Sequence, residues 1–225
     1  MNLRFWISLG LLALLFAASL FGGAGTLDWP AGWGFMAVFF GCALAVTGLV
    51  ARDDPALLAE RMKGTNQPGQ PLWDKIFLVV MQIAWFGWLA LMGADAVRFR
   101  WSAMPVWLQV LGGALLIVAH WMMHLTFREN TFLAPVVRVQ SERGHRVIST
   151  GPYAIVRHPL YAAALLVLAG AALMLGSWYG LLASLVLAAG FAWRAVKEER
   201  VLRGALDGYE AYAARVRYRL APGIW

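Results

Sequence analysis

Long apolar blocks separated by polar segments dominate the sequence. Each block is about 16–25 residues long and carries almost no charge, and about 20 apolar residues are what a helix needs to cross a bilayer core about 30 Å thick. Because backbone polar groups must be paired inside a bilayer, such blocks are expected to be helical. The pattern predicts an all-α, multi-pass bundle with six spans, at residues 3–25, 31–50, 76–97, 105–127, 160–175 and 178–196.

The last two blocks are separated only by Gly176 and Ser177. So short a connection predicts a tight helical hairpin, whose first arm is short enough to turn within the membrane. A hairpin brings its two ends together, and polar segments lie at both ends, at residues 128–161 and 194–225. These segments are expected to form one site. The chain is therefore divided into N-terminal membrane helices, residues 1–127, and a C-terminal functional core, residues 128–225.

The first block resembles a signal peptide, because Arg4 precedes its apolar run and small residues end it at 22–25. Its removal would leave an odd number of crossings. We interpret it as a retained helix.

Composition supports a membrane protein and explains the net charge of +7. With 61% hydrophobic and 14% charged residues, the chain is far more apolar than soluble domains, which are about half apolar. All of its 19 lysines and arginines except Arg98 and Arg100 fall on one side of the six-span topology. The positive-inside rule places that side, with both termini and the two long loops, in the cytoplasm, as in a bacterial-type inner membrane. The basic surplus thus indicates topology, and nucleic acid is not an expected partner.

Two histidines stand on one face of the fourth block. His120 and His124 are four residues apart, a spacing that suits a pair of metal ligands. No carboxylate or thiolate lies at a familiar ligand spacing from them, so hydrogen bonds between packed helices are the favoured interpretation. No metal is expected.

The segments flanking the hairpin carry a distinctive set of motifs. Before it, a stretch from His145 through Gly151 to Tyr153 leads into Arg157-His158-Pro159-Leu160-Tyr161, and after it come Glu198-Glu199, Tyr209-Glu-Ala-Tyr212 and Pro222. With these motifs, residues 128–225 resemble the isoprenylcysteine carboxyl methyltransferase family, which is related to the membrane phospholipid methyltransferases.

The resemblance implies a site for S-adenosylmethionine. By position, it implies cofactor contacts at Gln140, His145, Val147, Ile148, Tyr153, His158, Pro159, Tyr161 and Glu198. Arg194 matches the arginine that the family associates with the methyl-accepting substrate. The family usually has glycine two residues after the tyrosine of Arg-His-Pro-x-Tyr, where this chain has Ala163. We interpret that departure as a change of fit in the cleft, without loss of activity.

Each of these residues also has a plainer interpretation. Proline is common at the first position of a helix, so Pro159 alone indicates helix entry. His158 alone fits a histidine at the membrane interface whose hydrogen bonds are made within the protein. Consecutive helix positions differ by about 100°, so Glu198 and Glu199 are not expected to face the same cleft. One should contact the cofactor, while the other pairs with Arg203 four residues on.

The function implied by the whole is an S-adenosylmethionine-dependent membrane methyltransferase, with a carboxylate on a lipophilic, isoprenylcysteine-like acceptor as the favoured substrate. A carboxylate is ionised at neutral pH and needs no base, and Arg194 can hold it. A thiol or an amine must lose a proton first, with Glu199 or His158 as the base. Phospholipid N-methylation and small-thiol S-methylation stay as alternatives. A transporter or membrane scaffold is the non-enzyme alternative, although no internal repeat supports a transporter.

Overall fold

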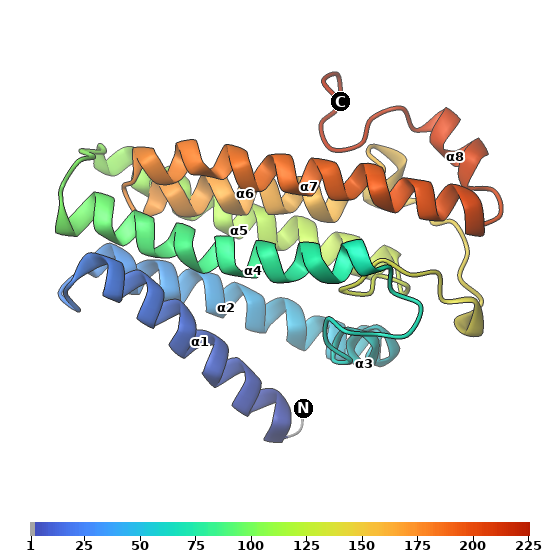
Figure 1. Ribbon diagram of the computed structural model, residues 1–225, viewed down its shortest axis with the longest axis horizontal. Coiled ribbons are helices and arrows are strands. Elements are labelled where there is room, and N and C mark those ends of the chain that lie inside the picture. The colour runs from blue at the N-terminus through green and yellow to red at the C-terminus, as the bar shows by residue number, and fades with distance from the viewer. Residues whose placement is uncertain (1–2) are drawn as a thin grey trace. The chain divides into compact units, whose positions relative to one another are not determined.

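The computed structural model describes residues 3–225, apart from the side chain of Arg4, and this part of the chain is helical without a strand (Figure 1). Met1 and the charge of Arg4 lie outside the description. The helices are α1 (Leu3–Ala24), α2 (Pro30–Asp53), α3 (Pro55–Arg61), α4 (Leu72–Gly93), α5 (Val106–Glu129), α6 (Pro159–Met174), α7 (Trp178–Ala205) and α8 (Tyr209–Arg215). The all-α, multi-pass prediction is confirmed.

Five helices have the length and composition to cross a membrane, namely α1, α2, α4 with its π-helical extension Ala94–Arg98, α5 and α7. The remaining predicted span corresponds to α6, which has only 16 residues and is the short hairpin arm that the sequence predicts. Helix α7, the second arm of the hairpin, continues nine residues beyond the predicted end at 196, to Ala205. Its charged extension is helical because Lys, Glu and Arg are good helix formers, which a hydropathy pattern does not register.

The chain forms two compact units, and most of the long helices contribute to both. Unit 1 consists of Met1–Ala45, Met81–His120 and Leu165–Ala188, and unit 2 of Val46–Val80, Trp121–Ala164 and Ala189–Trp225. The functional division at residues 127 and 128 stays a prediction.

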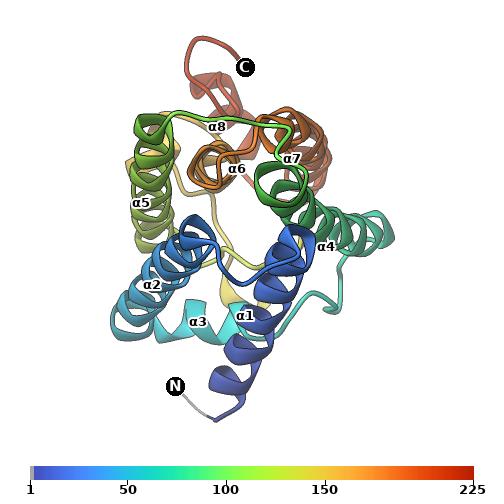
Figure 2. The same ribbon diagram turned by 90° about the vertical axis from the view of Figure 1, so that its left-hand side faces the viewer.

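In unit 1, glycines allow close helix packing (Figure 2). A Cβ atom on Gly112 of α5 would lie 2.3 Å from the backbone nitrogen of Met174 in α6, and one on Gly23 of α1 would lie 2.1 Å from the carbonyl oxygen of Ala90 in α4. In a bilayer the hydrophobic effect does not drive helices together, so their association depends on close packing. Small residues at these contacts let the helix backbones approach closely.

The α6–α7 turn is held by a buried carboxylate in unit 1. Gly176 has a φ of +76°, which glycine adopts without strain. The next residue, Ser177, donates its hydroxyl to Oδ2 of Asp95 at 2.5 Å and accepts the backbone N–H of Gly180 at 2.7 Å. The turn of the hairpin is therefore closed by side-chain hydrogen bonds as well as by its short length.

Candidate active site

Unit 2 contains a cavity of about 390 Å³, within the range of about 300–1,000 Å³ typical of small-molecule sites. Its walls come from α3 to α8 and from the loop between α5 and α6. The sequence-predicted residues that line it are His145, Val147, Ile148, Tyr153, His158, Pro159, Tyr161, Arg194 and Glu198. Gln140 and Glu199 are the predicted site residues outside this lining.

The open end of the hairpin brings together the two polar segments that flank it. α6 begins at Pro159, and just before it the backbone N–H groups of Arg157 and His158 donate to the carbonyl oxygens of Tyr218 and Arg219, each at 2.9 Å. The loop and the tail thus pair through their backbones, which anchors the entry to α6 beside the C-terminal segment.

A relay of polar groups crosses the cavity wall from α4 to α7. The hydroxyl of Tyr161 donates to Oε2 of Glu198 at 2.5 Å and accepts Nη1–H of Arg194 at 2.9 Å. Arg194 also donates Nε–H to Oδ1 of Asp74 at 2.9 Å and Nη2–H to the carbonyl oxygen of Pro135 at 3.0 Å. All three nitrogens of Arg194 are thus engaged, and it does not form the i,i+4 pair with Glu198 that the spacing allows.

Sequence reasoning missed Asp74, the first member of this relay. It is fully buried, and its second oxygen accepts hydrogen bonds from Gln70 and from the backbone of Val137. An acidic residue in the first turn of a helix interacts favourably with the helix dipole. The position of Asp74 in the sequence therefore indicated a role in stabilising α4. The nearby glutamine was the available signal that this carboxylate is not solvated.

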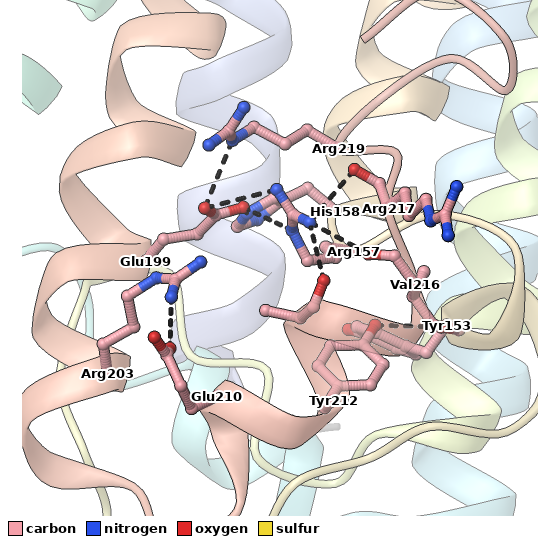
Figure 3. Close-up of polar contacts among 11 residues, drawn as sticks. Tyr153, Arg157, His158, Glu199, Arg203, Glu210, Tyr212, Val216, Arg217 and Arg219 are labelled. Atoms are coloured by element: carbon pink, nitrogen blue, oxygen red, sulfur yellow. Dashed lines mark hydrogen bonds and ion pairs between the residues drawn. The ribbon is translucent and has the colours of Figure 1, made fainter.

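Glu199 faces away from the cavity and forms an ion-pair cluster (Figure 3). Its carboxylate accepts from Nε of Arg157 at 2.7 Å and Nε of Arg219 at 3.2 Å, and Nε2 of His158 lies 3.2 Å away. The expected pairing with Arg203 is wrong, because Arg203 contacts Glu210 instead. A buried carboxylate needs charged or hydrogen-bonding partners inside the protein, and the buried Arg157 supplies them where the solvent-facing Arg203 does not.

Gln140 supports the loop that carries His145. Its buried side chain donates to the carbonyl oxygen of Phe132 at 2.6 Å and accepts from Arg143 at 2.5 Å, while its backbone N–H donates to Nδ1 of His145 at 3.3 Å. The imidazole stacks on the ring of Phe132, with centroids 4.7 Å apart. Burial lowers the pKa of His145 below its usual 6.5. The ring is therefore neutral at pH 7, with its proton on Nε2.

An aromatic cluster joins the loop to the tail. Tyr153 packs with Tyr209, Tyr212 and their apolar neighbours, and Tyr212 donates its hydroxyl to the carbonyl oxygen of Tyr153 at 2.9 Å (Figure 3). Burial raises the pKa of Tyr153, and Asn130 donates to its hydroxyl at 2.9 Å. The hydroxyl groups of Tyr153 and Tyr212 are therefore hydrogen-bonded, and the cluster attaches α8 to the cavity wall.

The alanine that replaces the family's glycine does not line the cavity. Ala163 is completely buried, whereas the next residue, Ala164, is part of the lining. The methyl group at this position therefore packs against protein, and the expected change of fit in the cleft is not seen there.

The two histidines of α5, His120 and His124, are both buried. His120 is hydrogen-bonded through Nδ1 to the carbonyl oxygen of Leu116 at 2.8 Å, within its own helix. Across residues 3–225, no group of three or more His, Cys, Asp and Glu side chains is placed to hold a metal ion.

The family model for phospholipid methyltransferases matches residues 107–207. This match confirms the resemblance to the membrane methyltransferases. The matched segment runs from the first turn of α5 to just beyond α7, so it covers the loop and the hairpin that build most of the cavity. No curated protein matches the chain. The matched family consists of membrane methyltransferases, and its members generally use S-adenosylmethionine.

Proposed function

We propose that the protein is an integral membrane methyltransferase that uses S-adenosylmethionine and methylates a carboxylate on a lipophilic, isoprenylcysteine-like acceptor. The observation that carries this proposal is the cavity of unit 2, which collects the family-motif residues from both ends of the hairpin into one wall.

The chemistry of the cavity fits the proposed cofactor. Glu198 offers a carboxylate to an ammonium or to ribose hydroxyl groups, and Val147 and Ile148 offer apolar surface to a planar base. The neutral ring of His145 has an N–H to donate, and the positive end of the α6 dipole, at Pro159, favours a carboxylate nearby. When bound, S-adenosylmethionine supplies an electrophilic methyl group on a sulfonium.

Arg194 is better placed to organise the site than to bind the acceptor. Each of its three nitrogens already donates a hydrogen bond, to Asp74, to Tyr161 and to the carbonyl oxygen of Pro135. It holds the Tyr161 hydroxyl, which in turn holds Glu198. A carboxylate acceptor is already ionised, so this chain needs to supply alignment and exclusion of water, and a fixed Glu198 contributes alignment.

A second candidate function is methylation of an amine or a thiol, as in a phospholipid N-methyltransferase. Two observations favour it: the name of the matching family, and the contact of 3.2 Å between Nε2 of His158 and Glu199. A histidine that lines the cavity and is oriented by a carboxylate behind it is the arrangement of a general base. In this reaction His158 would remove the acceptor's proton, while Glu199 would act through it.

Methyl transfer from labelled S-adenosylmethionine tests the proposal and separates the acceptors. Full-length protein in neutral detergent is incubated with a prenylcysteine analogue, with phosphatidylethanolamine and with a small thiol. The favoured function predicts base-labile methyl ester on the prenylcysteine. Labelling of the phospholipid or the thiol, abolished by His158→Ala, would favour the second candidate. No transfer to any acceptor from a protein that binds the cofactor would contradict both.

A further inference from the structure

One arginine in the cavity wall is not matched by a carboxylate. Arg61, the last residue of α3, lines the cavity, and no ion pair with it occurs among residues 3–225. The other cavity arginines are either paired with a carboxylate or exposed: Arg138 pairs with Glu60, Arg157 with Glu199 and Arg194 with Asp74, and Arg146 is exposed.

The protein satisfies little of the hydrogen-bonding capacity of Arg61. A guanidinium has five N–H donors, and here one hydrogen bond is made, from Nη1 to the carbonyl oxygen of Leu133 at 3.2 Å. The group also lies over the ring of Phe127, 4.5 Å from its centroid. Burial lowers the pKa of Arg61 to about 10, so the group is still charged at neutral pH. Arg61 is half-buried, and a partly buried charge without a counter-charge is destabilising, so an anion in the cavity would relieve it.

The surroundings of Arg61 are apolar. Phe127 belongs to a cluster with Val50 and Leu57, against which Met123 and Leu133 pack. Phe127, Met123 and Leu133 also line the cavity, together with Leu160 and Ala164. The cavity residues of this set come from the C-terminal end of α5, from the start of α6 and from the loop between them. A cation set in an apolar wall suits an amphiphile, whose tail contacts the wall while its acidic group meets the guanidinium.

We propose that Arg61 is the anion-binding residue of the acceptor site and receives the carboxylate or phosphate of an amphiphilic acceptor. The proposal rests on the proposed function and names an acceptor contact other than Arg194, whose three nitrogens each already donate a hydrogen bond within the protein. The planar guanidinium can bind either anion with two parallel hydrogen bonds. The carboxylate of the cofactor is the other source of the same chemistry, and the test separates the two.

Binding of three probes with the same chain tests the assignment. Decanoate, decyl phosphate and decanol are titrated into the full-length protein in neutral detergent, and S-adenosylhomocysteine is titrated separately. Arg61→Gln should weaken both anions at least about tenfold, as expected for a lost charge-assisted bond, and leave decanol and S-adenosylhomocysteine within about twofold. Arg61→Lys should fall between. Arg128→Gln removes an exposed charge outside this cavity and serves as the control.

A melting experiment distinguishes a ligand-binding arginine from a structural one. Without ligand, Arg61→Gln should melt at a temperature no lower than the wild type, because it removes a half-buried charge that has no carboxylate partner. If the melting temperature fell and the binding of decanol weakened as much as the binding of the two anions, the proposal would be overturned in favour of a structural role. Unchanged anion binding would also overturn it. Loss of S-adenosylhomocysteine alone would assign Arg61 to the cofactor. If anions bind through Arg61 but no methyl group is transferred, the proposed function fails and this assignment stands.

Discussion

At the scale of single residues, the site depends on how polar groups are shared between neighbours. Tyr161 is the clearest case, because its hydroxyl joins the guanidinium of Arg194 to the carboxylate of Glu198. Its ring also stacks on His158, with an interplanar angle of 6°. Tyr161 is thus the side chain through which α6 orients groups from both flanking segments.

Tyr161→Phe should weaken binding of S-adenosylhomocysteine about tenfold while leaving the aromatic packing in place. The change leaves one donor of Arg194 and one oxygen of Glu198 without their partner, and each such loss costs about 1–3 kcal/mol. Calorimetry on the detergent-solubilised protein measures the affinity. Tyr179→Phe, an exposed tyrosine in unit 1, is the matched control. Wild-type affinity in Tyr161→Phe would show that the hydrogen bonds of Tyr161 do not contribute to cofactor binding.

His145 should make stability fall as the pH drops below about 6.5. Burial is the main cause of its lowered pKa, which Arg143 and Arg138 lower further and Glu198 and Glu142 oppose. Between this lowered value and the unfolded value of about 6.5, the unfolded chain binds more protons, so acid favours unfolding. Melting temperatures measured from pH 8 to pH 5 test this. His145→Asn should lose part of the slope, and an unchanged slope would contradict the prediction.

At the scale of elements, one arginine holds the tail to the hairpin. Nη1 of Arg157 donates to the carbonyl oxygens of Ala213, Val216 and Arg217 at 2.9–3.3 Å, and its Nε–H donates to Glu199 on α7 (Figure 3). These carbonyls come from the end of α8 and the residues beyond it, where a helix leaves acceptors unpaired. A single guanidinium therefore fixes the segment that carries Tyr209 and Tyr212 into the cavity wall.

Arg157→Lys should loosen this tail without unfolding the membrane helices. Lysine keeps the charge beside Glu199 but lacks the planar fork that reaches several carbonyls at once. Limited digestion with chymotrypsin should cut faster within residues 206–225, and the melting temperature should fall by a few degrees. Arg217→Lys, an exposed neighbour in the same segment, is the control. Equal digestion rates in both variants would contradict the inference that Arg157 holds the tail in place.

At the scale of the whole molecule, the distribution of charge predicts on which side of the membrane the site opens. The basic residues outside the apolar blocks lie in the same loops and tail that build unit 2, whereas Arg98 and Arg100 lie between α4 and α5. By the positive-inside rule, the cavity and both termini are expected in the cytoplasm.

Single cysteines in a Cys42→Ala background test this orientation. Asn66→Cys and Asp207→Cys, both at exposed positions, should react with an impermeant maleimide only after the cells are opened. Asp207 is preferable to the adjacent Gly208, whose φ of +81° disfavours any side chain. Ala103→Cys, between α4 and α5, should react in intact spheroplasts. The reverse labelling pattern would invert the topology.

The sequence by itself determined the membrane class, the helical segments, the short hairpin and the motif residues at the hairpin's ends. These features depend on local patterns: the length of an apolar block, a two-residue turn, a proline at a helix start. Even the placement of Glu198 and Glu199 on different helix faces follows from the step of about 100° between consecutive residues.

Only the tertiary structure decided which polar groups pair. Asp74 with Arg194, Glu199 with Arg157 and Arg219, and Arg61 without a carboxylate join or isolate residues that are far apart in the chain. Local spacing favoured i,i+4 pairs, which are worth only a few tenths of a kcal/mol on an exposed helix. An enclosed charge gains far more from a partner inside the protein, and that partner is whichever group the packing of the helices brings within reach.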